Sequence, residues 1–151
     1  MTRISDLGKN LEKLPDLFLE YNEALKDIDS ILLIKGKSIK DANRDAQEQY
    51  FYDQKRVELK SIVDFLEMRI KSIRSKLFRS LTEHNPRELT ERSKERYIDS
   101  EPEFLEAQQI YFEMKELYEK YLSINESFKA RGYAMNNITK AIIASVEDVE
   151  L

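Results

Sequence analysis

Five basic side chains gather within residues 69–82, and no acidic side chain interrupts them. Cations at this density attract phosphate groups, and an aromatic ring among them can stack on a base of a single strand. The pattern therefore indicates a surface for single-stranded nucleic acid. Its candidate contact residues are Arg69, Lys71, Arg74, Lys76, Phe78 and Arg79.

On a helix with 100° per residue, Lys71, Arg74 and Phe78 fall within about 60° of each other, beside the apolar stripe. No side chain that would read a base edge is identifiable, so we expect little sequence preference. The alternative is a solvated basic face in which another helix covers Phe78.

The charge of the chain is unevenly distributed. Residues 69–96 hold nine basic and four acidic side chains, a net charge of +5, whereas the whole chain has a net charge of -4. Residues 1–68 and 97–151 are both acidic, at -3 and -6. A nucleic-acid site is therefore expected only in the middle of the chain.

Residues for catalysis are scarce. The chain has no cysteine and one histidine, His84, which lies two residues before Pro86 and so at a helix break. The segment Gly36-Lys37-Ser38 imitates the end of a phosphate-binding loop, but Ile31 stands where its first glycine belongs and a helical segment precedes it. We expect no enzyme activity, no metal and no cofactor.

Long helices must position these residues, because three glycines and three prolines are too few for a fold with many turns. Apolar residues at steps of three and four from Leu59 to Leu81 predict a long helix over about 39–82. The sequence predicts an all-α single domain over 1–151 in a helix–turn–helix layout. Its other expected parts are a short helix from Ser5 to Leu14, a helix from an Asp16 cap to about Leu32 that ends near Gly36, a Ser38 cap, and a polar, partly helical linker over 87–99.

A helix over about 101–128 is predicted by Ser100-Glu101-Pro102-Glu103, which fits a capping box. It carries two heptad-like apolar series that share residues, so its apolar face is too wide for one neighbour. We expect other subunits to cover part of this face in a homo-oligomeric ring built by the C-terminal helices in 100–151; the alternative is a helix at the centre of a monomeric bundle. The expected oligomerisation residues are Phe104, Ile110, Tyr111, Met114, Leu117, Tyr118, Tyr121, Ile124 and Phe128.

No apolar run approaches the roughly 20 residues that cross a membrane, and the first residues lack a signal-peptide pattern. We therefore expect a cytoplasmic protein without a membrane partner.

The block Lys129-Ala130-Arg131-Gly132-Tyr133-Ala134 resembles the Lys-Ser-Arg-Gly-Phe-Ala segment of the UvsY-type recombination mediators of T4-type phages. An apolar helix precedes the block and a short final helix follows it, with Met135, Ile138, Ala141 and Ile142. Arg96-Tyr97 before an acidic stretch is similar to the family as well. Arg74-Ser75-Lys76-Leu77 matches the family's Lys-x-Arg-Leu pattern with its two cations exchanged, a change that a non-bidentate phosphate contact tolerates.

This resemblance implies a helical homo-oligomer that binds single-stranded DNA in DNA recombination, repair and replication. It implies two protein partners, a RecA-type recombinase and the phage single-strand DNA-binding protein, in the cytoplasm of the host cell. The competing interpretation is a coiled-coil scaffold or adaptor that binds only proteins.

Overall fold

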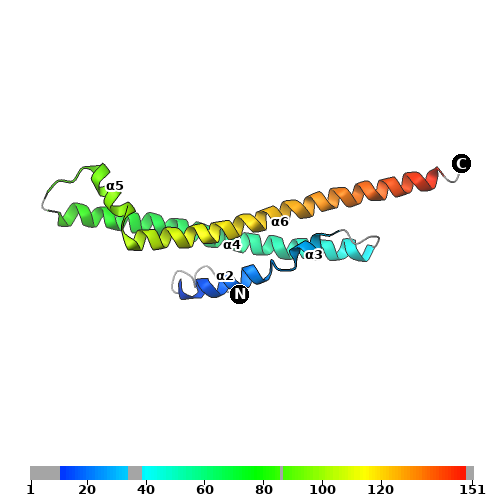
Figure 1. Cartoon of the computed structure of the whole chain (residues 1–151), viewed down its shortest axis with the longest axis horizontal. Coiled ribbons are helices and arrows are strands. Elements are labelled where there is room, and N and C mark those ends of the chain that lie inside the picture. The colour runs from blue at the N-terminus through cyan, green and yellow to red at the C-terminus, as the bar shows by residue number, and fades with distance from the viewer. Residues whose placement is uncertain (1–10, 34–38, 86, 149–151) are drawn as a thin grey trace. The chain divides into compact units, whose positions relative to one another are not determined.

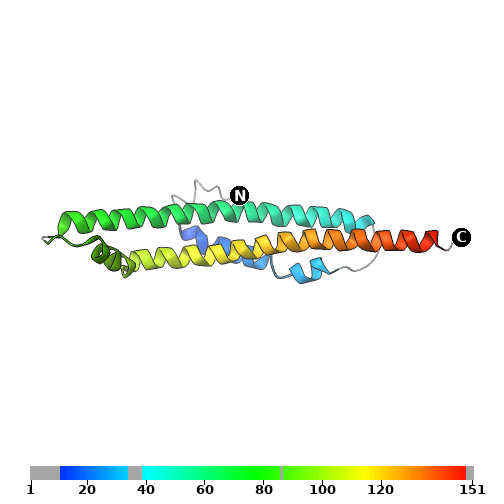
Figure 2. The same ribbon diagram turned by 90° about the horizontal axis from the view of Figure 1, so that it is seen from above.

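The computed structural model describes residues 11–33, 39–85 and 87–148, and its regular structure is helical (Figures 1 and 2). No strand occurs among these residues, so the predicted all-α class is confirmed for them. Within the same ranges, no helix combines the length and apolarity needed to cross a membrane. The elements are the 3-10 helix η1 (Leu11–Lys13) and the α-helices α2 (Leu14–Glu23), α3 (Ile28–Leu32), α4 (Ile39–His84), α5 (Glu91–Asp99) and α6 (Pro102–Glu147).

The long helix α4 agrees with its prediction to within two residues at its C-terminal end. At this end, side chains bond the free carbonyls: Asn85 donates to the Leu81 carbonyl at 3.2 Å, and His84 Nδ1 lies 3.1 Å from the Ser80 carbonyl. Asn85 also precedes a proline, which disfavours the α conformation at the residue before it.

The N-terminal segment forms two helices where the sequence predicts one. The helix that begins at Leu14 ends at Glu23, because turn bonds replace helical ones: the Leu25 amide donates to Asn22 and the Lys26 amide to Glu23. The Asn22 side chain donates to the Phe18 carbonyl at 2.8 Å, a local bond of the kind that competes with helix formation. Most of the expected first helix, the Gly36 end and the Ser38 cap lie outside the described residues.

Helix α5 spans Glu91–Asp99, which corrects the linker expected over 87–99 from partly to mostly helical. Thr90 caps it, since its hydroxyl accepts from the Ser93 amide at 3.3 Å. Ile98 anchors it, with 0% of the residue exposed. The predicted capping box at Ser100 is corrected too: the Ser100 hydroxyl donates to the Tyr97 carbonyl at 2.8 Å and so serves the end of α5.

The last helix, α6, is one continuous helix of 46 residues where the sequence predicts a helix to 128 and a short final one. Gly132 lies inside it, and a Cβ there would meet nothing within 4 Å. A glycine within a helix costs only about 1 kcal/mol relative to alanine, which is too little to end a helix whose neighbouring residues favour it.

The chain divides into two compact units, and each long helix contributes to both. Unit 1 consists of residues 1–14 and 58–118, and unit 2 of residues 15–57 and 119–151.

In unit 1, α4 and α6 run in opposite directions with α5 beside them (Figures 1 and 2). One side chain from each helix meets in the core, namely Ile73 of α4, Ile98 of α5 and Phe104 of α6, together with Ala107. Burying side chains of this size stabilises a fold by about 1.5–3 kcal/mol each. Half-buried apolar residues of α4 pack against this cluster: Ile70, Leu77, Phe78 and Leu81.

In unit 2, buried tyrosines join α2, α4 and α6. The Tyr121 hydroxyl donates to the Tyr21 carbonyl at 2.7 Å, and the Tyr52 hydroxyl donates to the Ala24 carbonyl at 2.9 Å. The rings of Tyr21 and Tyr121 meet edge to face, with 5.8 Å between centroids. Burial, followed by the charges of Glu48 and Asp27, raises the pKa of Tyr52. Each hydroxyl is thus satisfied by a carbonyl near the end of α2, which fixes that helix against the long ones.

Candidate nucleic-acid interface

A shallow groove of about 540 Å³ lies on the surface of unit 1, within the predicted basic segment. Two of its lining residues carry guanidinium groups and two carry hydroxyls, so most of its polar lining can donate to an anion. Glu83 is the acidic member of the lining. The lining residues are Arg74, Ser75, Phe78, Arg79, Thr82 and Glu83.

Arg74 is the most constrained cation of this groove. Its guanidinium carbon lies 5.7 Å from the centroid of the Phe104 ring, and its Nη1 lies 3.8 Å from Asp99 Oδ1. The two side chains of the ion pair are 44% and 58% exposed. An exposed pair at this distance is weak, so a phosphate can replace the Asp99 carboxylate.

Phe78 is half-buried and lines the groove. Its ring also packs against the core cluster of unit 1, and Lys94 Nζ lies 5.0 Å from its centroid. These contacts favour the alternative interpretation of the sequence, a ring covered by another helix, over the predicted contact with a base. A base cannot stack on Phe78 without displacing Lys94.

Lys94 of α5 is a functional candidate that the sequence analysis did not identify. Its Nζ donates to the Thr82 hydroxyl at 3.0 Å, which holds the ammonium group beside the groove. The available signal was the cap at Thr90 followed by Glu91, which indicates the start of a helix. Ile98 is the fourth residue after Lys94, so the two share one side of that helix.

The other predicted cations differ in how free they are. Lys76 and Arg79 are exposed and form no ion pair with any residue that the structure describes. Lys71 lies 3.5 Å from Glu67 in an exposed pair along the helix. Arg69 is half-buried, and its Nη1 is buried without a hydrogen-bond partner among the described residues. Arg69 is therefore a poorer contact residue than the sequence predicts.

The predicted oligomerisation face is used by packing within the chain. Phe104, Met114, Leu117, Tyr121, Ile124 and Phe128 are buried, and Ile110, Tyr111 and Tyr118 are half-buried. The prediction that α6 needs several partners is sound, but helices of the same chain supply them. These nine side chains therefore offer little surface to a second subunit.

The C-terminal end of α6, unlike the predicted oligomerisation face, is exposed to solvent. Every residue from Asn136 to Asp148 is exposed. Large apolar side chains recur among them at helical steps, so they share one side of the helix. They are Ile138, Ile142, Ile143 and Val146, preceded by the exposed Tyr133.

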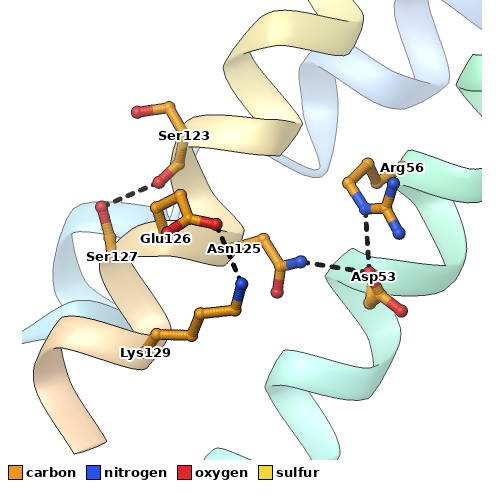
Figure 3. Close-up of polar contacts among 7 residues, drawn as sticks. All are labelled: Asp53, Arg56, Ser123, Asn125, Glu126, Ser127 and Lys129. Atoms are coloured by element: carbon orange, nitrogen blue, oxygen red, sulfur yellow. Dashed lines mark hydrogen bonds and ion pairs between the residues drawn. The ribbon is translucent and has the colours of Figure 1, made fainter. Parts of the chain in front are cut away.

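Unit 2 holds a second, more polar groove of about 430 Å³, lined by residues of α4 and α6. Figure 3 shows its central contacts: Asp53 Oδ1 accepts from Arg56 Nε at 2.9 Å and from Asn125 Nδ2 at 3.2 Å. On the same stretch of α6, Lys129 Nζ donates to Glu126 at 2.9 Å. The polar groups are thus engaged with each other, which suits a structural role.

The block at Lys129–Ala134 is also engaged within unit 2. The Arg131 side chain is 9% exposed and pairs with Asp45, and its Nη2 donates to the Leu33 carbonyl at 3.3 Å. A buried arginine with these partners fixes the start of α4 and the end of α3 to α6. Arg131 therefore has a structural role in unit 2, whereas Tyr133 of the same block is exposed.

Among the described residues, no group of three or more histidine, aspartate or glutamate side chains is arranged to hold a metal ion. Comparison with known protein families, with curated proteins and with solved structures finds no match to this chain.

Proposed function

We propose that this chain is a recombination mediator: it binds the backbone of single-stranded DNA and promotes loading of a RecA-type recombinase onto strands coated by a single-strand-binding protein. The observation that carries the proposal is the groove of unit 1, where Arg74, Arg79 and Lys94 come from two helices. Three cations around one groove suit successive phosphates rather than a single buried ion.

The availability of the cations supports the same proposal. Lys76 and Arg79 are exposed without an ion pair among the described residues. Cations with no acidic partner on their own chain are the ones that gain most from a phosphate partner, because nothing has to be displaced. Their release of counterions from the strand supplies affinity without sequence preference.

Assembly is the second part of the proposal. The apolar stripe Ile138, Ile142, Ile143 and Val146 is uncovered in the single chain, and Lys140 is the only charged residue between 133 and 146. A nearly neutral stripe repels no second copy of itself, and packing several copies removes it from water. In a closed ring, the helix–turn–helix layout of α4, α5 and α6 repeats the groove on each subunit, and linked sites bind far more tightly than one.

The mechanism is thermodynamic. A ring that holds the strand along repeated grooves keeps it extended and accessible, so that the recombinase filament nucleates more readily than coat protein rebinds. The chain itself hydrolyses no nucleotide in this mechanism, and it acts in the cytoplasm.

A scaffold that binds only proteins is the second candidate. The exposed stripe of α6 favours it, because such a stripe fits any amphipathic partner helix. The acidic surface of the whole chain, with a net charge of -4, favours it as well.

Fluorescence anisotropy with a labelled oligo(dT) strand separates the two candidates. The mediator binds at sub-micromolar concentration in low salt and weakens steeply as salt is added, with a slope of about -0.7 per phosphate contact. Absence of binding in low salt would refute the mediator and leave the scaffold. Labelled duplex of the same length serves as the control, and the mediator prefers the single strand.

A further inference from the structure

Tyr97 is an exposed aromatic residue on a firmly anchored helix. The residue is 52% exposed, whereas Ile98 beside it in the chain is 0% exposed and belongs to the core of unit 1. The same helix is capped by Thr90 at its start, and the Ser100 hydroxyl bonds the Tyr97 carbonyl at its end. The Tyr97 ring is therefore presented to solvent from a backbone held at both ends.

The side chain of Tyr97 is held as well. Its hydroxyl donates a hydrogen bond to the Glu101 carboxylate, which raises the pKa of the phenol above its ordinary value of 10.0. Fixing the hydroxyl reduces the rotamer freedom that a partner of the ring would otherwise have to remove.

Tyr97 lies between the two residues by which α5 contacts the basic groove. Lys94, three residues earlier, contacts Phe78 and Thr82, and Asp99, two residues later, contacts Arg74. The helix that carries the ring thus runs along the groove that the phosphates would follow.

The other aromatic residues of unit 1 suit this role less well. Phe78 is covered by Lys94, and Phe104 is buried. Phe112 is 58% exposed, but the ring that it contacts is Tyr111, which is not a residue of the groove.

We propose that Tyr97 stacks on a base of the single strand whose phosphates bind Arg74, Arg79 and Lys94. This inference rests on the proposed function and adds a base-dependent contribution to it. Stacking on an aromatic ring is tolerant of sequence, because every base has a π face. It gives a preference for single strands, whose bases are free to turn outward.

The chain contains no tryptophan, so Tyr97→Trp introduces a single fluorescent reporter at the proposed contact. We expect oligo(dT) to quench the emission of this variant strongly, and an abasic strand of equal length to leave it nearly unchanged. Phe112→Trp, the matched control in the same unit, should show no base-dependent quenching. Equal quenching of Tyr97→Trp by both strands would overturn the inference.

Affinity gives an independent test by anisotropy. Tyr97→Ala should weaken binding of oligo(dT) by about tenfold, the order expected for one stacked base, and leave binding of the abasic strand unchanged. Tyr97→Phe should stay within about twofold of the native chain, because it keeps the ring. Equal losses for both strands in Tyr97→Ala, or a loss in Tyr97→Phe as large as in Tyr97→Ala, would overturn the stacking role.

Failure of the stacking inference can be distinguished from failure of the proposed function. If the native chain binds oligo(dT) and the abasic strand equally, the stacking inference is wrong and the proposed function stands. If it binds neither strand, both are wrong.

Discussion

The two units of the chain treat their cations differently. In unit 2, Lys26, Arg44, Lys55, Arg56, Lys129 and Arg131 each pair with an acidic side chain. In unit 1, Lys60, Lys71 and Arg74 are paired as well. Lys76, Arg79 and Lys94 of unit 1 form no ion pair among the described residues, and neither does Lys140 of unit 2. Pairing, rather than the number of charges, decides whether a cation is free to bind an anion.

Exposed apolar side chains, in contrast to unpaired cations, are concentrated in unit 2. Among the residues that the structure describes, fifteen large apolar side chains are exposed, and eleven of them belong to unit 2. Under the proposed function, strand binding falls to unit 1 and assembly to unit 2, so a variant that impairs one task should leave the other unchanged.

The largest effect is expected from Ile138→Asp combined with Ile142→Asp in unit 2. Two carboxylates on the exposed stripe make its burial against another copy unfavourable, so the particle should become a monomer in sedimentation velocity. Strand affinity should fall by about a hundredfold or more through loss of linked sites.

Asn136→Asp with Asn137→Asp is the matched control, because it adds the same charge to the same turn of helix beside the stripe. This control should keep both the mass and most of the affinity. A monomeric native chain, or an unchanged mass in the double isoleucine variant, would contradict the assignment of assembly to the end of α6.

The next effect concerns unit 1, where Lys76→Glu combined with Arg79→Glu should weaken oligo(dT) binding by about thirtyfold in low salt. Both side chains are exposed and make no ion pair in the described part of the chain, so folding should be unaffected. Loss of two phosphate contacts should also make the salt slope shallower by about 1.4, as measured by anisotropy at several salt concentrations.

Lys13→Glu with Lys115→Glu makes the same change of net charge elsewhere in unit 1. An equal loss of affinity in this control would mean that net charge, and not the groove, governs binding. A change of particle mass in Lys76→Glu with Arg79→Glu would mean that the two surfaces are not separate.

The sequence predicted a helix correctly where its apolar periodicity was long and unbroken. The stripe from Leu59 to Leu81 keeps helical steps over many turns and ends before a proline, so α4 was predictable. The C-terminal end of α6 could not be predicted, because a glycine such as Gly132 can either end a helix or lie within it at a cost of about 1 kcal/mol, and the sequence does not distinguish the two cases.

Of the residues around the groove, Arg74, Phe78 and Arg79 were named from the sequence, and Lys94 was not. Over nine residues, α5 has too few apolar side chains for periodicity to show, so the contact of Lys94 with Phe78 could not be predicted from the sequence. Similarly, two apolar series on α6 predicted that several helices pack against it, but periodicity does not state whether those helices belong to the same chain.

A smaller effect, on stability alone, is expected for Tyr121→Phe in unit 2. It leaves the Tyr21 carbonyl without the bond of 2.7 Å that it accepts in the native chain, which should lower the free energy of unfolding by about 1–2 kcal/mol. Urea denaturation followed by circular dichroism measures this. Tyr133→Phe, at an exposed position, should change stability little, and strand affinity per assembled particle should be the same in both variants.

The smallest effect is expected for Asp99→Asn in unit 1, and it has the opposite sign. Asp99 competes with phosphate for Arg74 across a distance of 3.8 Å, so removing its charge should tighten oligo(dT) binding by about threefold in low salt. Asp64→Asn makes the same change of net charge and frees Lys60 from a pair at 2.5 Å, on the same helix but outside the groove lining. If both variants tighten binding equally, the gain comes from net charge. A gain confined to Asp99→Asn would mean that the strand and the Asp99 carboxylate compete for Arg74.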